Sequence, residues 1–261
     1  MDTVFRAEEL DGLRLATRGR IVSLAVVALL LFFLAPAPEV YYFHGALVLF
    51  AAIGLADHAV ARRPFGRPWH RYVFIALDFA LMAYIFVAPN PWDVLPAPLQ
   101  MQLRNGTFVY FFMLLAGYAF SHNPRLMVWA GFAAAASWIV GTASIVRRPD
   151  TVTWFDTAVS EIVANPEDAL AEYLDPRFVD VNVILQDVIV VLIVAGILAG
   201  VVARSRGLVM RQAAAARERA NLARYFSPNM VDDLARADEP LGAVRSQPVA
   251  VLFADIVGFT A

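Results

Sequence analysis

The residues with the clearest chemical potential in this 261-residue chain lie close to its C-terminal end. An uninterrupted apolar run, Val249 to Ala254, leads directly into one carboxylate, Asp255, and Gly258 follows three residues later. A short apolar run of this kind is typical of a buried strand. The pattern therefore predicts a strand that carries an acid into a turn able to approach a phosphate. Taken without its neighbours, Asp255 better fits a residue that only ends a buried strand.

Two blocks of sequence together resemble the class III nucleotide cyclases. Residues 253–260, with the sequence FADIVGFT, are very close to the opening strand of the cyclase catalytic domain. Residues 224–231, with the sequence RYFSPNMV, are similar to the segment just ahead of that domain in bacterial members, where it couples a membrane or sensor module to catalysis. The blocks have the family's order and spacing, and the part upstream of them matches only in plan.

The resemblance implies an adenylate cyclase that converts ATP to 3′,5′-cyclic AMP and pyrophosphate at a homodimer interface, with two Mg²⁺ or Mn²⁺ ions. Asp255 would supply a metal-bridging carboxylate and Ile256 a carbonyl ligand, since hard cations prefer oxygen. Backbone N–H groups at the start of the following helix would hold the triphosphate. The residues in that role are Val257, Gly258, Phe259 and Thr260. None of these residues distinguishes adenine from guanine.

Other parts of the cyclase machinery belong to later regions of the family's domain. These parts are the second metal carboxylate, the residues that select the base, and the Asn and Arg that act on the transition state. The 261 residues alone are therefore expected to be inactive, and the chain is expected to be the N-terminal region of a larger enzyme.

The composition indicates a membrane protein. Hydrophobic residues make up 60% of the chain and charged residues 17%, whereas soluble domains have ~45–50% and ~25%. A net charge of -2 argues against a nucleic-acid partner. The absence of cysteine excludes disulfides, zinc–thiolate sites and iron–sulfur clusters. The basic residues are all arginine and alanine is abundant, which favours a bacterial source.

Six apolar segments approach the ~20 residues that a helix needs to cross a bilayer. They are residues 21–37, 41–60, 72–88, 107–120, 126–146 and 183–202, of which the first and fourth are least certain. Arginines gather before the first segment, between the second and third, and after the sixth. The positive-inside rule then predicts a multi-pass protein of the bacterial inner (plasma) membrane with both termini in the cytoplasm.

The predicted fold is an all-α membrane protein. A six-helix transmembrane bundle continues into a long cytoplasmic signalling helix, and the first strand of an incomplete α/β cyclase domain follows. The expected parts are a cytoplasmic segment (1–20), the transmembrane domain (21–203) with an external loop (147–182), a coupling helix (204–226), a linker (227–248) and the start of the catalytic domain (249–261).

The external loop carries many acids and a helix-start pattern. Asn165 can cap a helix, Pro166 fits its first position, and Glu167 and Asp168 fall in its first turn. We expect one or two short helices against the membrane surface. The loop is either a lid for a ligand or cation or a solvated connection, and the second interpretation is favoured.

The coupling helix has a short heptad pattern that includes Leu208 and Leu222. Gly196 and Gly200 form a Gly-x-x-x-Gly pair in the sixth span, which lets two helices approach closely. These residues are candidates for a homodimer contact. The alternatives are a single amphipathic linker for the heptads and packing inside the bundle for the glycines.

Three ionisable residues inside the spans are candidate functional sites: Asp78, Asp187 and His44. A carboxylate in a membrane is costly and marks function by default. The sequence offers no Lys or Arg within a span as a partner, so these acids are expected to be protonated, bonded to Tyr or Ser, or in a wet cavity. His44 and His58, fourteen residues apart, have a spacing seen in haem-carrying helices, but no partner for His44 is evident and haem is disfavoured.

Two classes of function remain. The favoured one is the receptor and transducer region of a cyclase, which answers an unknown membrane or external ligand. The alternative is a passive anchor that holds two catalytic domains together. A haem-binding membrane sensor is a third, less favoured hypothesis.

Overall fold

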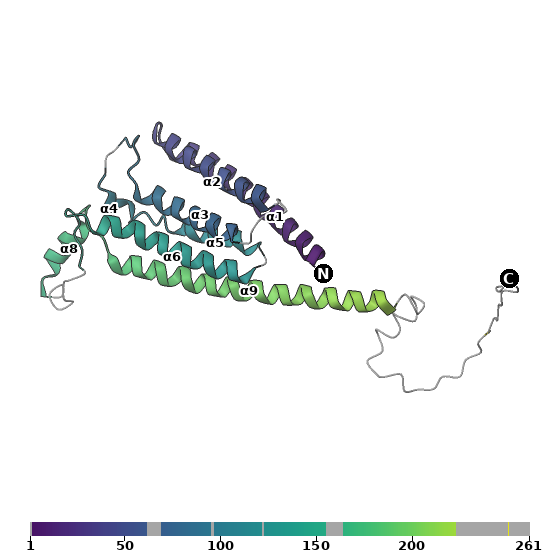
Figure 1. The fold of residues 1–261 in the computed structure, drawn as a ribbon. Helices are drawn as coiled ribbons and strands as arrows, with labels where there is room; N and C mark the ends of the chain where they lie inside the picture. Colours follow the sequence, from purple (N-terminus) through teal and green to yellow (C-terminus); the bar gives the residue numbers. More distant parts are fainter. Residues whose placement is uncertain are drawn as a thin grey trace. The chain divides into compact units, whose positions relative to one another are not determined.

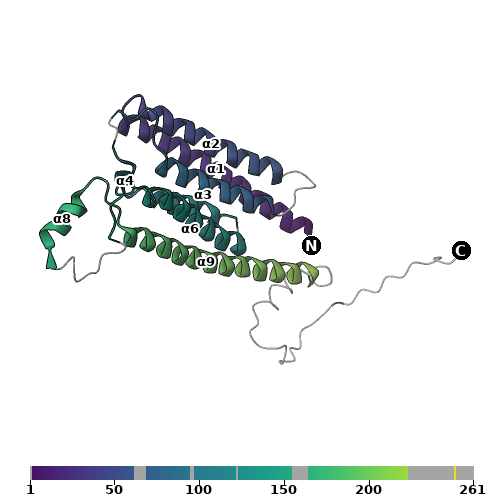
Figure 2. The same cartoon turned by 60° about the vertical axis from the view of Figure 1, so that its left-hand side comes forward.

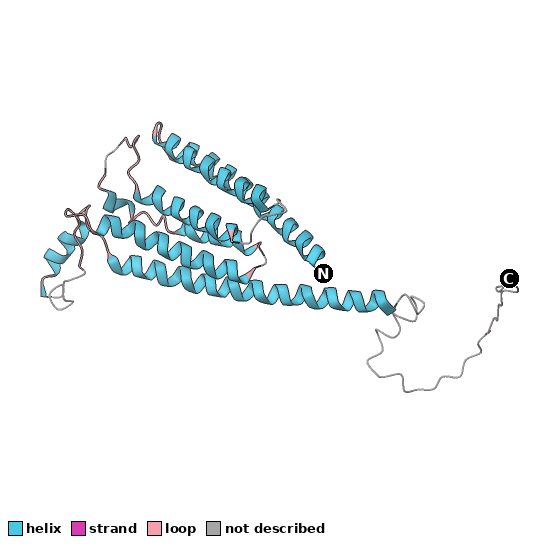
Figure 3. Cartoon of the chain, in the orientation of Figure 1, coloured by secondary structure: helices cyan, strands magenta, loops and turns pink. Residues whose placement is uncertain are grey.

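The computed structural model describes residues 2–61, 69–94, 97–121, 123–154, 164–222 and 250. Within these ranges the chain is mostly helical and contains no strand (Figures 1 and 3). The helices are α1 (Asp2–Leu34), α2 (Glu39–Ala61), α3 (His70–Val87), α4 (Leu99–Gln102), α5 (Val109–Ala119), α6 (Pro124–Val146), α8 (Pro166–Leu174) and α9 (Val181–Leu222). The predicted linker, and the predicted strand apart from Ala250, lie outside the described residues.

Five of these helices are long and apolar enough to cross a membrane, namely α1, α2, α3, α6 and α9. This finding supports the prediction of a membrane protein. Helix α5, which corresponds to the fourth predicted span, has only 11 residues. Its length of ~16 Å is about half of the hydrocarbon thickness. Large apolar side chains such as Phe32, Phe33 and Leu34 are 69%, 76% and 70% exposed on α1, as expected of a surface that faces lipid.

The chain divides into two compact units, residues 1–208 and 209–261. In the first unit α1 packs with α2, α2 with α3, and α3 with α6 (Figure 2). The first part of α9 runs alongside α6 in both views (Figures 1 and 2). In the second unit the structure describes the end of α9, up to Leu222, and Ala250.

The core of the first unit combines stacked aromatic rings with small residues. Phe111 lies between Phe79 and Trp138, with ring centroids 5.9 and 5.3 Å away. On α9 the residues that join this core recur at steps of about one turn, and they are Val191, Ala195, Ala199 and Val202. Because alanine is short, α9 can approach α6 closely.

Local signals set where the helices start and stop. The Asn123 side chain accepts a hydrogen bond from the backbone N–H of Arg125 at 3.1 Å, and Pro124 occupies the first position of α6. Gly106, with φ of 64°, lies in the turn between α4 and α5, where a side chain would be strained. These features lie on either side of α5, the counterpart of the fourth predicted span, and limit its length.

The predicted external helix is present as α8, with Asn165 at its N-cap position and Pro166 as its first residue. The Arg104 guanidinium donates to the backbone carbonyls of Tyr173, Asp175 and Phe178 at 2.8, 2.7 and 3.1 Å. It also lies over the rings of Tyr173 and Phe178. Arg104 therefore ties the loop around α8 to the α4–α5 connection. The part of the predicted loop that precedes α8, residues 155–163, lies outside the described residues.

Candidate functional site

The residues that carry the cyclase resemblance lie outside the described part of the chain. They are Asp255, Ile256, Val257, Gly258, Phe259 and Thr260. Among the described residues there is no group of three or more His, Cys, Asp or Glu side chains that could hold a metal ion. The structure therefore bears on the membrane part, where it brings several predicted and unpredicted residues together.

Asp78 lies at the centre of a buried ion pair with Arg20. The two terminal nitrogens of the Arg20 guanidinium donate to the two carboxylate oxygens, Nη1 to Oδ2 at 2.6 Å and Nη2 to Oδ1 at 2.5 Å. The Asp78 side chain is 1% exposed and that of Arg20 is 18% exposed. Such a two-point contact is among the strongest polar interactions in proteins.

This pair corrects the prediction that the carboxylates inside the spans have no arginine within a span as a partner. Arg20 precedes the apolar run that starts at Ile21, so the sequence pattern placed it in a cytoplasmic segment. In the structure α1 is a single helix from Asp2 to Leu34, and it places Arg20 opposite the middle of α3. The apolar run counted from Ile21 left Arg20 out, whereas the part of α1 that is long and apolar enough to cross a membrane begins at Thr17 and includes it.

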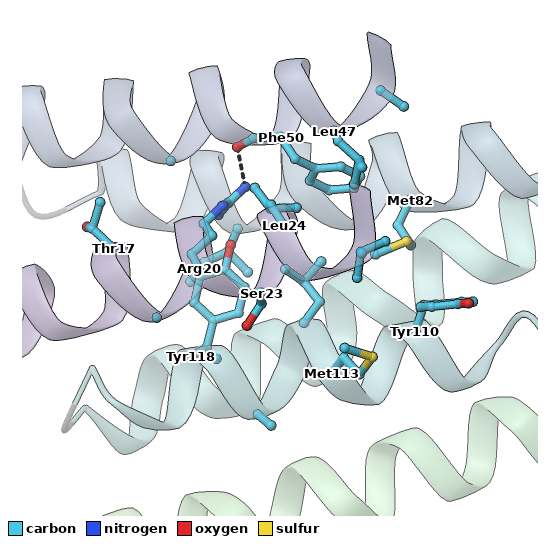
Figure 4. A pocket seen from close by; sticks show the side chains of 18 of the residues that line it. Thr17, Arg20, Ser23, Leu24, Leu47, Phe50, Met82, Tyr110, Met113 and Tyr118 are labelled. Carbon is cyan, nitrogen blue, oxygen red and sulfur yellow. Dashed lines mark hydrogen bonds between the residues drawn. The ribbon is translucent and has the colours of Figure 1, made fainter. Parts of the chain in front are cut away.

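Two further groups complete what we call the polar cluster, which comprises Arg20, Asp78, Tyr118 and the Phe50 carbonyl. The Tyr118 hydroxyl on α5 donates to Asp78 Oδ2, which agrees with the expected bond to a tyrosine. Arg20 Nη2 also donates to the Phe50 carbonyl on α2 at 2.7 Å, and the guanidinium lies 5.9 Å from the Phe50 ring centroid (Figure 4). The cluster thus links α1, α2, α3 and α5.

Gly54 makes room for the arginine. It lies one turn beyond Phe50 on α2, and a Cβ atom at this position would lie 2.8 Å from Arg20 Nε and 2.9 Å from its Cδ. Real Cβ atoms essentially never come that close, so any larger residue must displace the guanidinium.

Gly54→Ala is therefore expected to destabilise the fold by about 1–3 kcal/mol, the usual cost of overpacking. The measurement is the unfolding midpoint of the purified protein in detergent. Gly45→Ala on the same helix is the matched control, because a Cβ there meets nothing within 4 Å among the described residues. Equal midpoints for the two variants would show that the position of the Arg20 side chain does not require a glycine at residue 54.

A cavity of about 540 Å³ lies beside the polar cluster, between α1, α2, α3 and α5. Figure 4 shows Thr17 and Arg20 toward one side of it and Met82 and Tyr110 toward the other. The charged lining residues are Arg20 in the middle of α1, Asp57 near the end of α2 and Arg71 near the start of α3, and the hydroxyl-bearing Tyr118 and Ser121 lie around the end of α5. Two further polar lining residues, Thr107 and Tyr110, lie around the start of α5. The opposite half of the cavity is mostly apolar, with Val27, Leu31, Phe43, Leu47 and Met82 among its lining residues.

The other intramembrane candidates have different surroundings. Asp187 is half-buried on α9. The His44 imidazole is half-buried, and its Nδ1 lies 2.8 Å from the Val40 carbonyl on the same helix. The arrangement joins neither residue to the polar cluster, so of the three intramembrane candidates only Asp78 belongs to it.

The proposed dimer residues on α9 lie on its open side. A Cβ atom at Gly196 or Gly200 would meet nothing within 4 Å among the described residues, and Leu208 is 51% exposed. Core packing on α9 uses Ala195 and Ala199 instead. Among the described residues the Gly-x-x-x-Gly pair therefore has no internal packing partner. Leu222 is the last residue of α9, and its side chain is not among those described.

Arg20, Tyr118 and the cavity were the features that sequence reasoning missed. Comparisons with protein-family models, with curated proteins and with solved structures find no match to this chain.

Proposed function

We propose that this chain is the membrane-embedded regulatory region of a class III adenylate cyclase. The observation that carries the proposal is the continuity of α9, a single helix of 42 residues from Val181 to Leu222. At ~1.5 Å per residue it is ~63 Å long, about twice the hydrocarbon thickness. It leads from an apolar span to the block at residues 224–231, which resembles the segment ahead of a cyclase domain.

The proposed topology has six crossings with both termini in the cytoplasm. Five helices have the length for it, and the fourth crossing uses α5 together with the turns that flank it. The arginines before α1, between α2 and α3, and after the apolar part of α9 then lie on the cytoplasmic side. This orientation places residues 249–261 where ATP is available.

The proposed partner is a second copy of the chain. The open face of α9 around Gly196, Gly200 and Leu208 would pack against its symmetry mate, because glycines let two backbones come close in a membrane. A rotation or shift of α9 would then pass directly to two catalytic domains. A passive anchor would use the same contact without any such movement.

In the catalytic step the ribose 3′ hydroxyl loses its proton to water and its oxygen attacks the α-phosphorus of ATP. The bond between the α-phosphorus and the oxygen that bridges to the β-phosphorus breaks, and pyrophosphate leaves. By resemblance, Asp255 and the Ile256 carbonyl would bind divalent cations, Mg²⁺ or Mn²⁺, which when bound supply charge stabilisation for the entering and leaving oxygens. The backbone N–H groups of Val257–Thr260 would orient the triphosphate. Asp255 is the side chain on which this activity depends most.

The test is the activity of the full-length gene product in membranes. Asp255→Asn is expected to lower cyclic AMP formation by ~100-fold or more, because even the outer partners of a metal ligand are worth ~10–100-fold. Asp238→Asn, a nearby acid outside both resembling blocks, is the control. A protein that makes no cyclic nucleotide from ATP or GTP, or an Asp255→Asn variant with unchanged activity, would refute the proposal.

A second experiment distinguishes the receptor hypothesis from the anchor hypothesis. Residues 21–203 are replaced by an unrelated dimeric membrane anchor, and basal activity and its response to membrane extracts are compared. If the membrane domain is a receptor, the chimeric enzyme loses the response and keeps its basal activity. If the membrane domain is only an anchor, the chimeric enzyme keeps both.

A further inference from the structure

We propose that the cavity between α1, α2, α3 and α5 binds an uncharged amphiphile from the membrane, with its polar group at the end formed by the polar cluster and Ser121. This inference deepens the receptor part of the proposed function, because it names the site and the chemical class of its ligand.

The size of the cavity suits a small molecule rather than a helix of another chain. Its volume of about 540 Å³ falls within the ~300–1,000 Å³ that is usual for ligand sites. A helix about 10 Å wide fills on the order of 400 Å³ for each 5.4 Å turn. The cavity would therefore accept little more than one turn of a partner helix.

The cavity reaches the surface that faces lipid. Met113 lines it and is 51% exposed, and Ser23 on α1 also lines it and is exposed. A molecule dissolved in the bilayer could enter between α1 and α5 without crossing water. Most of the lining is apolar, which suits a hydrocarbon chain.

The polar end has balanced charges, which disfavours a charged ligand. Arg20 is paired with Asp78. Asp57 and Arg71 both line the cavity, and they carry opposite charges. A carboxylate, phosphate or ammonium group would add an uncompensated charge in a medium of low dielectric constant. A hydroxyl or carbonyl group would not.

A buried hydroxyl at this end has an unused capacity for hydrogen bonding. Ser121 lines the cavity, is 6% exposed, and its Oγ has no hydrogen-bond partner among the described residues. Buried polar groups are nearly always paired, and an unpaired one is unfavourable. A hydroxyl or carbonyl of a ligand would satisfy Ser121 after a small rotation of its side chain.

The experiment uses the full chain in lipid nanodiscs and a photoreactive dodecanol with a diazirine on its alkyl chain. Labelled peptides are identified by mass spectrometry, and unlabelled dodecan-1-ol, dodecanoate and dodecyltrimethylammonium serve as competitors with the same tail. We expect labelling of α1 and α5 residues that line the cavity, and competition by the alcohol at roughly tenfold lower concentration than by either ion, the scale of one hydrogen bond.

Two variants locate the site. Leu24→Trp fills the cavity and should abolish the labelling, whereas Val26→Trp, on the lipid-facing side of α1 and 61% exposed, should not. Ser121→Ala should remove the preference for the alcohol and keep the fold, because the hydroxyl has no hydrogen-bond partner to lose among the described residues. Ser137→Ala, outside the cavity, is its control.

Equal competition by the three head groups would mean that the cavity accepts any acyl chain, and it would overturn the proposal. Labelling that survives Leu24→Trp would overturn the assigned site. Because binding is measured without nucleotide, either failure leaves the cyclase proposal untouched. If the cyclase proposal were refuted, the result of this binding experiment would likewise stand.

Discussion

Replacing Asp78 with asparagine is expected to destabilise the protein by about 3–5 kcal/mol, the usual cost of removing one partner from a buried ion pair. The substitution leaves the Arg20 guanidinium charged and almost enclosed, since the side chain is only 18% exposed. A guanidinium cannot lose its proton in a protein. The variant also loses an acceptor for the Tyr118 hydroxyl.

Removing Arg20 instead of Asp78 should destabilise the protein less. In Arg20→Met the carboxyl group of Asp78 keeps Tyr118 as a partner and can be neutralised by a proton, which arginine cannot do. The double variant Arg20→Met/Asp78→Leu should recover most of the loss, because an apolar pair can replace a buried ion pair without penalty. The expected order of stability is therefore wild type and double variant, then Arg20→Met, then Asp78→Asn.

The measurement is the helix content at increasing concentrations of denaturing detergent, determined by circular dichroism. The control is Asp150→Asn, which breaks the exposed pair between Arg148 and Asp150 with 3.2 Å between Nε and Oδ1. Exposed pairs contribute little, so this variant should unfold like the wild type. If Asp78→Asn does so as well, the polar cluster does not hold the four helices together.

Gly131→Leu is expected to cause the second large effect, a loss of at least ~1–3 kcal/mol through overpacking between α6 and α9. A Cβ atom at Gly131 would overlap with the Cβ atom of Ala195 on α9. Leucine would also meet Leu192, which lies near the same point. The two helices must therefore separate, and the lower unfolding midpoint in detergent reports this.

Gly196→Leu is the matched control, because it changes a glycine on the open side of α9. It should leave the unfolding midpoint unchanged and weaken self-association instead. The chain has no cysteine, so a single Ile197→Cys substitution, at a position 61% exposed, reports the contact through disulfide formation between copies. Equal destabilisation by Gly131→Leu and Gly196→Leu would contradict the assignment of the two faces.

Several predictions from the sequence correspond directly to the structure. Apolar segments of about twenty residues became long helices because a helix satisfies its own backbone in lipid. Helix α8 starts at Pro166 as predicted, because proline suits the first position of a helix, although the side chain of Asn165 before it makes no capping hydrogen bond among the described residues. The helix after the last span also continued as expected, up to Leu222. The cyclase-like residues around Asp255 stay a prediction, because they lie outside the described residues.

What the sequence could not supply was the partner of Asp78. The sequence by itself determined that the chain is apolar, helical and long enough to cross a membrane, because these properties depend on composition and on contacts within a turn. Only the tertiary structure brought Arg20, Phe50, Asp78 and Tyr118 together from four helices and left a cavity beside them. It also decided which face of α9 is packed and which is open. Such contacts depend on how helices rotate and tilt against each other, and a local pattern in one sequence does not encode that.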